Sequence, residues 1–377
     1  FEKAGLQAFF NLRKVKRAQR LIFTGNGVIT HKNSPRFSRC CGLLSSQNRL
    51  HIPRGILVKG PRPMLRSVPP MFRACCLSLA FAPALFAAAP VEADFYKITT
   101  FETPKETAME VGSIDLLPEG KLALGTRRGE IWIVSGAGSS DPSAVSYKLY
   151  ASGLHEVLGL AYNPKDKNLY ATTRYEITRL KDTDADGRAD VFENVNDGWG
   201  VSGDYHEYAI GSRFDQKGDL WVTLCLTGSF SSQVPFRGWA LRITPEGKMV
   251  PTCSGIRSPG GIGFDADGEA YYCDNQGPWH GSCTLQHLVP GSFQGHPGGN
   301  IWYDLAPNMG PRPIDPIPEA FQGERGRKEA RPGGDPDRMV AERARIKELL
   351  PPAVYLVHGK IGNSASAIIC DTSGGKF

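Results

Sequence analysis

The sequence lacks a hydrophobic run long enough to cross a membrane, and it has no CxxC pair of the kind that holds structural zinc. Its longest apolar stretch, Ala74–Ala89, is shorter than the roughly 20 residues that a spanning helix needs. Acidic residues are almost absent from positions 1–63, where 13 Lys and Arg stand against the single acid Glu2. This segment shows no useful hydrophobic periodicity, so we expect a non-native or disordered leader; a nucleic-acid or membrane-binding tail is the weaker alternative.

The following segment has the order of features typical of a secretory signal peptide. Arg66 and Arg73 precede or begin the apolar stretch, and Val91-Glu92-Ala93 offers small residues at a cleavage site. We therefore expect a signal peptide over 64–93 and a mature chain over 94–377. That chain is predicted to be secreted or periplasmic, with no stable membrane span.

Removing the leader and signal peptide reverses the charge of the protein. The whole chain carries a net charge of +6, whereas from Asp94 on 29 basic residues face 36 acidic ones, a net charge of −7. The basic character of the whole chain therefore stems from its leader, and nothing in the mature part indicates a nucleic-acid partner.

Cysteine is sparse in the mature part. Five of the nine cysteines fall after Asp94, namely Cys225, Cys253, Cys273, Cys283 and Cys370. An odd number with wide spacing excludes a dense disulfide framework. Cys273 and Cys283 are the pair that we expect to form a disulfide if the chain is exported.

One acidic loop has the ligand spacing of a wrapped calcium ion. In Asp182-Thr-Asp184-Ala-Asp186-Gly187-Arg188-Ala-Asp190-Val-Phe-Glu193, oxygen ligands fall at positions 1, 3, 5, 9 and 12 of the loop, and glycine stands at position 6. Calcium takes about six to eight oxygens, Arg188 can offer its carbonyl, and Glu193 can close the site with both oxygens. A calcium site is predicted here; the alternative is a solvated acidic turn between strands.

A sequence pattern typical of two paired strands recurs four times and indicates an all-β fold. Each copy is an apolar run, a polar turn ending in Gly or Asn, and a second apolar run. The second runs begin at Leu122, Leu169, Leu220 and Ala270, which are 47, 51 and 50 residues apart. This period fits a four-stranded blade of a β-propeller. Further strands are expected at 129–134, 175–180 and 239–244, and the copies themselves at 114–124, 160–170, 212–222 and 262–272.

The end of the chain departs from the repeat. A proline-rich and charged insertion over about 304–350 ends in an expected helix before Pro351, and we interpret it as an excursion over one propeller face. A fifth copy begins at Ala367 and stops inside its hairpin. We thus expect residues 94–377 to form an incomplete propeller of roughly four to five blades.

Polar residues that can support chemistry cluster at blade boundaries. Gly203-Asp-Tyr-His206-Glu207 precedes the third hairpin, and a histidine with a pKa of about 6.5 can act as a base, oriented by Glu207. Gly255-Ile-Arg257-Ser-Pro-Gly-Gly261 precedes the fourth, and its arginine suits a planar, acidic ligand. Asp274-Asn-Gln-Gly-Pro278 follows that hairpin, where carbonyls near a Gly-Pro step can face an ion.

The order of these three motifs resembles the soluble glucose/sorbosone dehydrogenase family. Members are six-bladed propellers that use pyrroloquinoline quinone (PQQ) and calcium, and the resemblance covers roughly residues 110–377. It is strongest to large exported dehydrogenase-like proteins, which are often fused to haem-binding modules. Leu285–Pro297 and Gly153–Ala161 continue the match.

The resemblance implies a role for each matching residue. His206 is the general base that takes a proton from a sugar or polyol hydroxyl, and hydride moves to the quinone. Arg257 holds and polarises the quinone oxygens, and Asn275, Gln276, His155 and Glu156 are further cofactor-binding positions. The carbonyls of Gly277 and Pro278 bind an activating calcium, which makes Asp182–Glu193 a second, structural site. Electrons pass to an external acceptor such as a c-type haem domain.

Two other functions fit the sequence. The first is a non-catalytic, calcium-stabilised propeller that binds glycans or proteins, with Tyr205, Tyr208, Trp199, Trp279 and Trp302 as a stacking surface. The second is a calcium-dependent lactonase, which needs no quinone.

Overall fold

The computed structural model describes residues 6–8, 21–23, 91, 98–277, 279–316, 339 and 342–371. Most of the expected leader and signal peptide therefore lies outside the described residues, apart from two short strands that pair antiparallel, β1 (Leu6–Ala8) and β2 (Leu21–Phe23). None of the helices in the described part has both the length and the apolar character needed to span a bilayer.

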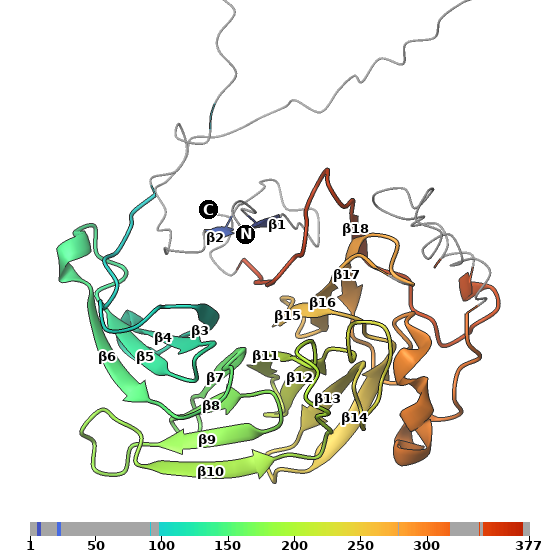
Figure 1. Cartoon of the computed structure of the whole chain (residues 1–377), viewed down its shortest axis with the longest axis horizontal. Coiled ribbons are helices and arrows are strands. Elements are labelled where there is room, and N and C mark those ends of the chain that lie inside the picture. The colour runs from blue at the N-terminus through green and yellow to red at the C-terminus, as the bar shows by residue number, and fades with distance from the viewer. Residues whose placement is uncertain are drawn as a thin grey trace, which may run out of the picture. The chain divides into compact units, whose positions relative to one another are not determined.

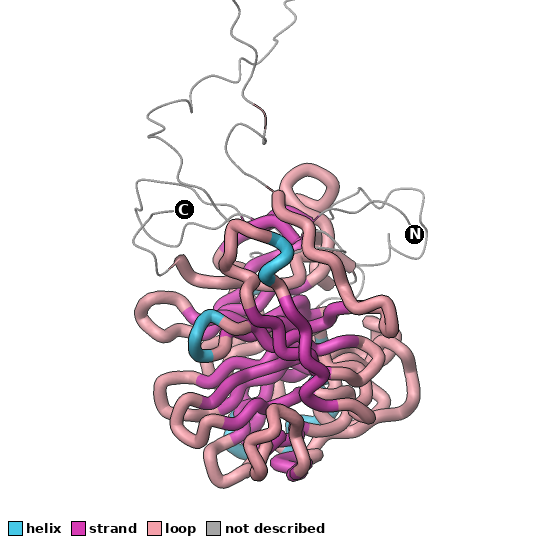
Figure 2. Tube along the Cα trace, turned by 90° about the vertical axis from the view of Figure 1, so that its left-hand side faces the viewer, coloured by secondary structure: helices cyan, strands magenta, loops and turns pink. Residues whose placement is uncertain are grey.

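The described residues from 111 on build four antiparallel blades of a β-propeller (Figure 1), which confirms the predicted fold class. Each blade is a four-stranded sheet whose strands follow one another in sequence order, and Figure 2 shows the strands gathered in the body of the molecule. The blades are β3 (Val111–Leu116), β4 (Leu122–Thr126), β5 (Ile131–Ser135) and β6 (Ser146–Ala151); β7 (Gly159–Asn163), β8 (Asn168–Thr172), β9 (Ile177–Lys181) and β10 (Val191–Asn196); β11 (Ala209–Phe214), β12 (Leu220–Leu224), β13 (Trp239–Ile243) and β14 (Met249–Ser254); and β15 (Pro259–Phe264), β16 (Ala270–Asp274), β17 (Cys283–His287) and β18 (Val354–Leu356).

All four predicted hairpins form the first two strands of a blade. The three additional strands predicted between them correspond to β5, β9 and β13. Sequence periodicity missed the fourth strands. In β6 and β10 the reason is exposure, because β6 has one buried residue and β10 has none.

Innermost strands approach one another closely, and glycine permits this. A Cβ atom at Gly211 in β11 would lie 2.9 Å from the backbone nitrogen of Ile262 in the next blade, and Gly211 also has φ +70°. A Cβ atom at Gly260 in β15 would lie 1.9 Å from the carbonyl oxygen of Ala365. The segment around Ala365 thus runs beside β15, where the innermost strand of a following blade would lie.

The hydrophobic core lies mainly between blades. The largest cluster joins the second and third blades around Trp239, which is completely buried and donates its indole N–H to the carbonyl of Gly299 at 2.7 Å. A second cluster joins the first and second blades, and a third joins the third and fourth. No blade could bury these faces alone, so the blades stabilise one another.

The described start of the insertion contacts the third blade, where the side-chain amide of Asn308 donates to the carbonyl of Pro251 in β14 at 2.8 Å. Short 3-10 helices form at η3 (Pro118–Gly120), η4 (Pro142–Ala144), η5 (Pro297–Leu305) and η6 (Pro307–Met309). Residues 317–338 of the predicted insertion lie outside the described residues, as do residues 372–377 of the fifth repeat copy. Beyond the gap, Met339, Ile346 and Leu349 pack on Phe293.

Candidate functional site

The strand order decides which loops share a face of the propeller. In each sheet, the connection from the second to the third strand and the connection into the next blade lie at the same end, because neighbouring strands are antiparallel. His206 and Arg257 lie on connections into the third and fourth blades, and Asn275 follows the second strand of the fourth blade. The three motifs that carry the family resemblance therefore gather at one end, called the site face below.

Hydrogen bonds tie the two connections together. Consecutive residues after β12 bind them both: the N–H of Cys225 donates to the carbonyl of Tyr208 at 2.9 Å, and the N–H of Leu226 donates to the carbonyl of Arg257 at 3.0 Å. The loop that holds His206 and the loop that holds Arg257 are thus neighbours on either side of one strand end.

His206 is half-buried on the site face. Its ring lies 4.1 Å from the ring of Tyr205 and 6.2 Å from that of Tyr208, centroid to centroid. Burial lowers the pKa of His206, the positive charge of Arg257 lowers it further, and the carboxylate of Asp204 opposes both. The imidazole is therefore neutral at pH 7 and able to accept a proton.

Glu207 does not orient this imidazole, contrary to the prediction from the sequence. Its side chain is completely buried and accepts hydrogen bonds from the backbone N–H and hydroxyl of Ser202 and from the hydroxyl of Thr227, at 2.6, 2.8 and 2.6 Å. In the described part of the chain, it is bonded to these groups rather than to His206. Glu207 fixes the loop, and the loop carries His206.

A second buried side chain, that of Arg237, fixes the loop that carries His206. Arg237 is completely buried, and its guanidinium donates to the carbonyls of Gly200, Glu207, Tyr208 and Arg174 at 2.7 to 3.0 Å. Burial lowers the pKa of Arg237 to about 10, with Glu207 acting in the opposite direction, so the group stays charged at neutral pH. One cation therefore joins the His206 loop to the turn between β8 and β9.

Arg257 lies against the loop that follows β16. Its side chain is nearly buried, and Nη1 donates to the carbonyls of Gln276 at 3.1 Å and Asn275 at 3.5 Å. The guanidinium packs directly on Gly277, where a Cβ atom would lie 2.0 Å from Cζ of Arg257. Residues Asn275–Gly277 form the wall that Arg257 faces. The side-chain amide of Asn275 fixes this wall by donating to the carbonyl of Ser258 at 3.0 Å.

One of the two calcium ligands that the resemblance implies, the carbonyl of Gly277, lies on this wall. The carbonyl of Gly277 accepts a hydrogen bond from the N–H of His280 at 3.1 Å, and Pro278 lies outside the described residues. The side-chain oxygen of Asn275 is buried and has no hydrogen-bond partner among the described residues. Asn275 also lines a cavity of about 250 Å³ between the innermost strands, together with Gly112, Leu158, Ile210, Pro259 and Gly260 and the segment 364–366. An unpaired acceptor beside a cavity fits a ligand that donates a hydrogen bond or carries a cation.

Glu156 and two arginines form an ionic group on the site face. The carboxylate of Glu156 accepts from Arg174 at 2.6 Å and from Arg127 at 3.1 Å. Arg174 also donates to the carbonyls of Asp204 and Tyr205 and lies 5.2 Å from the ring of Tyr208. His155 is exposed and contacts Tyr175, with ring centroids 5.4 Å apart.

Sequence reasoning missed Arg127 and Arg174, although a signal was present. Both follow a threonine in the turn after the second strand of a blade, as Thr126-Arg127 and Thr173-Arg174. Aligning the repeats strand by strand would have shown that the same blade position carries arginine twice. Together with Arg257, these residues give the site face three guanidinium groups around Tyr208 and His206.

Two expectations about other side chains are wrong. Cys273 and Cys283 are free, because Cys273 pairs across the sheet with Leu285, which places Cys283 two residues further along its strand. The aromatic residues do not form one exposed surface either. Trp199 is buried in the core, and Trp302 packs against the same cluster, whereas Tyr205 is 64% exposed.

Replacing Gly277 with alanine is expected to displace Arg257 without unfolding the protein. The guanidinium is the mobile end of a flexible side chain, so it can move away from the new methyl group. We expect the free energy of unfolding to change by less than about 1 kcal/mol. Affinity for the quinone that the family resemblance implies should fall at least tenfold. Gly138→Ala, at a position with open space around it and no positive φ, is the stability control for a glycine substitution. Unchanged quinone affinity in Gly277→Ala would exclude Arg257 from cofactor binding.

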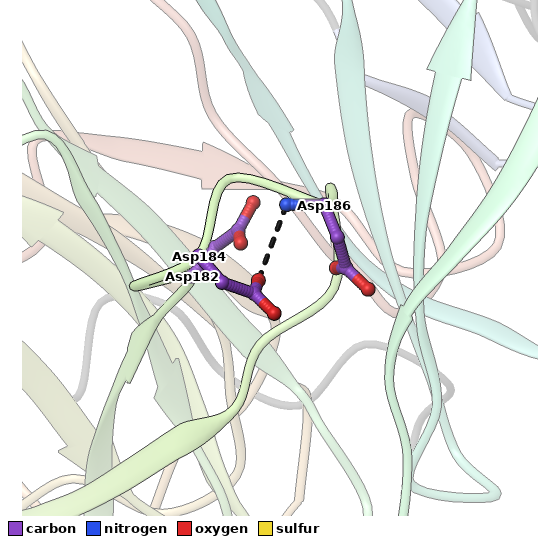
Figure 3. A group of neighbouring side chains, drawn as sticks. All are labelled: Asp182, Asp184 and Asp186. Atoms are coloured by element: carbon purple, nitrogen blue, oxygen red, sulfur yellow. Dashed lines mark hydrogen bonds between the residues drawn. The ribbon is translucent and has the colours of Figure 1, made fainter.

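The acidic loop lies at the opposite end of the second blade. It joins β9 to β10, and the carboxylate oxygens of Asp182, Asp184 and Asp186 lie within 4.8 Å of one another (Figure 3). One oxygen of Asp182 accepts from the N–H of Gly187 at 2.8 Å; the other is buried and has no hydrogen-bond partner among the described residues. This arrangement leaves an oxygen that a hard cation could take up.

The remaining ligands predicted for this loop are placed differently. Asp190 accepts hydrogen bonds from the backbone and hydroxyl of Thr183, and these bonds lower its pKa. Glu193 lies in β10 opposite Arg179 and forms ion pairs with Arg179 and Lys181. Arg188 is exposed, and its N–H donates to Asp186 at 2.7 Å. The structure thus brings together the first three aspartates of the loop and engages Glu193 elsewhere.

The acidic loop also joins two blades. The N–H of Ala189 donates to the carbonyl of Tyr150 in β6 at 2.8 Å, and Lys148 of the same strand donates to the carbonyl of Asp186. Burial, with Asp182 and Asp190 nearby, raises the pKa of Tyr150 to about 12. An ion bound here would stiffen the contact between the first and second blades, far from His206.

Comparison with family models gives a partial match. A family model described as a domain of unknown function, DUF7133, matches residues 139–298. No curated protein matches the chain significantly.

Several solved structures resemble the chain. An oxidoreductase of Thermus thermophilus, described as a glucose dehydrogenase, is 24% identical over 50% of this chain and 64% of its own, with a TM-score of 0.40. A PQQ-bound aldose sugar dehydrogenase of Streptomyces coelicolor is 20% identical over 51% of this chain and 65% of its own, with a TM-score of 0.41. The PQQ domain of a pyranose dehydrogenase from Coprinopsis cinerea is 14% identical over 50% of this chain and 54% of its own, with a TM-score of 0.41. The chain spans just under two thirds of the length of the first two of these proteins, and the solved structures similar to it include PQQ-dependent sugar dehydrogenases with a propeller fold.

Proposed function

We propose that the chain is the propeller of an exported sugar or polyol dehydrogenase that oxidises a C–OH group with PQQ and calcium. The observation that carries this proposal is the convergence of His206, Arg257 and the Asn275–Gly277 wall on one face. His206 is neutral at pH 7 because burial lowers its pKa, and Arg257 lies on the adjacent loop. A base beside a cationic group is the arrangement that oxidation of an alcohol requires.

The donor set of the site face fits the quinone. PQQ is planar and carries three carboxylates, and guanidinium groups bind carboxylates through paired donors. Arg127, Arg174 and Arg257 supply these groups, although Arg127 and Arg174 already share Glu156. The unpaired oxygen of Asn275 and the carbonyl of Gly277 supply acceptors for an accompanying calcium.

Each residue of this chain then has a chemical role. His206 takes the proton of the substrate hydroxyl, and the electron pair of the C–H bond leaves as hydride. When bound, the quinone supplies the two-electron acceptor for that hydride. Arg257 favours the negative charge that develops on the acceptor, and the Glu207 and Arg237 contacts keep His206 in place. An external acceptor must reoxidise the cofactor for a second turnover.

The test is turnover by the full chain with calcium, PQQ and an artificial electron-accepting dye. We expect reduction of the dye with a neutral aldose or polyol, and no reduction when either quinone or calcium is left out. Hydrolysis of a sugar lactone in the absence of quinone would instead favour the lactonase. Binding of glycans without turnover, by protein shown to hold quinone and calcium, would favour the non-catalytic propeller.

A structural calcium ion in the Asp182–Glu193 loop is the second part of the proposal. At a calcium concentration 100 times its dissociation constant, binding to the folded state alone adds about 2.7 kcal/mol. For a domain of this size we expect the melting temperature to rise by roughly 5 to 10 °C. The unpaired oxygen of Asp182 supports this expectation.

Substitution distinguishes this loop from general ion effects. The double variant Asp184→Asn/Asp186→Asn should lose the calcium-dependent rise in melting temperature. Asp267→Asn, in an exposed turn of the fourth blade, should retain it. An equal rise in both variants would place the stabilising ion somewhere other than this loop.

A further inference from the structure

Asp274 occupies an unusual position at the end of β16. Its carboxylate is completely buried, although aspartate is rarely buried without partners. Oδ2 accepts hydrogen bonds from the N–H of Arg257 at 2.9 Å and the hydroxyl of Tyr272 at 3.1 Å. Oδ1 accepts from the N–H groups of Ser258 and Asn275, both at 2.8 Å. One side chain therefore binds three backbone N–H groups in two different loops.

These bonds join two loops at the paired ends of β15 and β16. Arg257 and Ser258 lie on the connection into the fourth blade, whereas Asn275 begins the loop after β16. A buried N–H without an acceptor costs about 1–3 kcal/mol, so the carboxylate fixes both loops at once. His280 lies behind it, with Nδ1 at 3.8 Å from Oδ2 and within 3.3 Å of the side-chain nitrogen of Gln286.

The two loops are also joined on the side of the proposed site. The side chain of Arg257 donates to the carbonyls of Asn275 and Gln276. Asp274 holds the backbone of Arg257 and of Asn275 beneath this contact, which completes a closed circuit of hydrogen bonds. We therefore expect a change in the carboxylate to alter the distance between the guanidinium and the wall that it faces.

We propose that Asp274 is the positioning residue that sets Arg257 against the Asn275–Gly277 wall, and thereby sets the affinity of the site for its anionic quinone. This inference rests on the proposed function for its ligand, but the coupling of the two loops stands apart from it. Asp274 touches neither substrate nor cofactor in this account. It acts through the backbone of the residues that do.

The first experiment is a titration of Asp274→Asn with PQQ in the presence of calcium, in which calorimetry measures the affinity. The substitution keeps the shape of the side chain but replaces one carboxylate oxygen with an NH₂ group. That group cannot accept the backbone hydrogen bonds that the oxygen accepted. We expect affinity at least tenfold weaker than in the parent chain. Tyr272→Phe removes one hydrogen bond to the same carboxylate and leaves both loops bonded, so its affinity should stay within twofold of the parent.

Amide hydrogen exchange provides a readout that does not depend on the quinone. In the parent chain, peptides containing Arg257, Ser258 and Asn275 should be protected, and Asp274→Asn should lose this protection while peptides from the second blade keep theirs. Parent-like affinity or parent-like protection in a folded Asp274→Asn would overturn the inference. If Asp274→Asn does not fold, Asp274→Ser is measured by the same two criteria.

The two readouts distinguish this inference from the proposed function. If the folded parent binds no quinone with calcium present, the proposed function fails, and exchange alone decides whether Asp274 couples the loops. If the parent binds quinone and the variant binds it equally well, the function stands and the positioning role is wrong.

Discussion

Replacing His206 with alanine is expected to lower kcat by about 100- to 10,000-fold, the usual contribution of a general base. Quinone affinity should stay within a few-fold of the parent value, since Arg257 and the Asn275–Gly277 wall remain in place. Steady-state turnover and a separate quinone titration measure the two effects. His287→Ala is the control, because His287 lies at the opposite end of its blade, stacked on Tyr271.

The pH profile gives a second signature of the same residue. A base acts when it is unprotonated, so activity should rise as pH increases through the pKa of His206 and then level off. Burial and Arg257 lower this pKa. The midpoint of the rise in activity should therefore lie at a lower pH than the pKa of a free histidine, which is about 6.5. Full activity in His206→Ala, or the same rise with pH in that variant, would contradict the assigned role.

Replacing Arg237 with alanine is expected to reduce the free energy of unfolding by about 3–5 kcal/mol, the range measured when one partner of a buried ionic network is removed. Four carbonyls would lose the guanidinium as a donor, although those of Tyr208 and Arg174 keep a bond from Cys225 and from Trp199. Glu207 would lose the positive charge beside it. Because the same loops hold His206, kcat should fall as well. Urea denaturation and turnover measure the two effects.

An exposed arginine supplies the control for this experiment. Arg128 pairs with Glu110 on the surface, with both side chains more than half exposed. Removing such a pair costs about 0–1 kcal/mol, so Arg128→Ala should unfold close to the parent midpoint. Comparable loss of stability in both variants would mean that the buried guanidinium has no special role.

The architecture was predictable because its signals are local. A hairpin with apolar runs and a turn ending in glycine specifies its own register, and four copies at a spacing of about 50 residues specify stacked blades. Outer strands such as β6 and β10 were harder to find, since solvent on one side removes the requirement for apolar residues. Loops such as Asp274–Gly277 were identified by motif, but the motif did not show which group each side chain binds.

Contacts between distant segments account for the features that the sequence did not predict. Arg237 lies 30 positions from Glu207 and 63 from Arg174, yet it binds both backbones. Glu207 lies next to His206 in sequence, which suggested a catalytic pair, but the alternation of side chains sends it into the core. In the sequence, Asp274 was only the first residue of a predicted calcium-binding motif. The fold shows that its carboxylate joins two loops.

Binding of PQQ to the full chain, followed by tryptophan fluorescence and calorimetry with and without calcium, tests the central claim most directly. The arginines of the site face and the Asn275–Gly277 wall predict saturable binding of one quinone per chain that is lost when calcium is removed. A folded chain that binds no quinone in the presence of calcium would contradict the account.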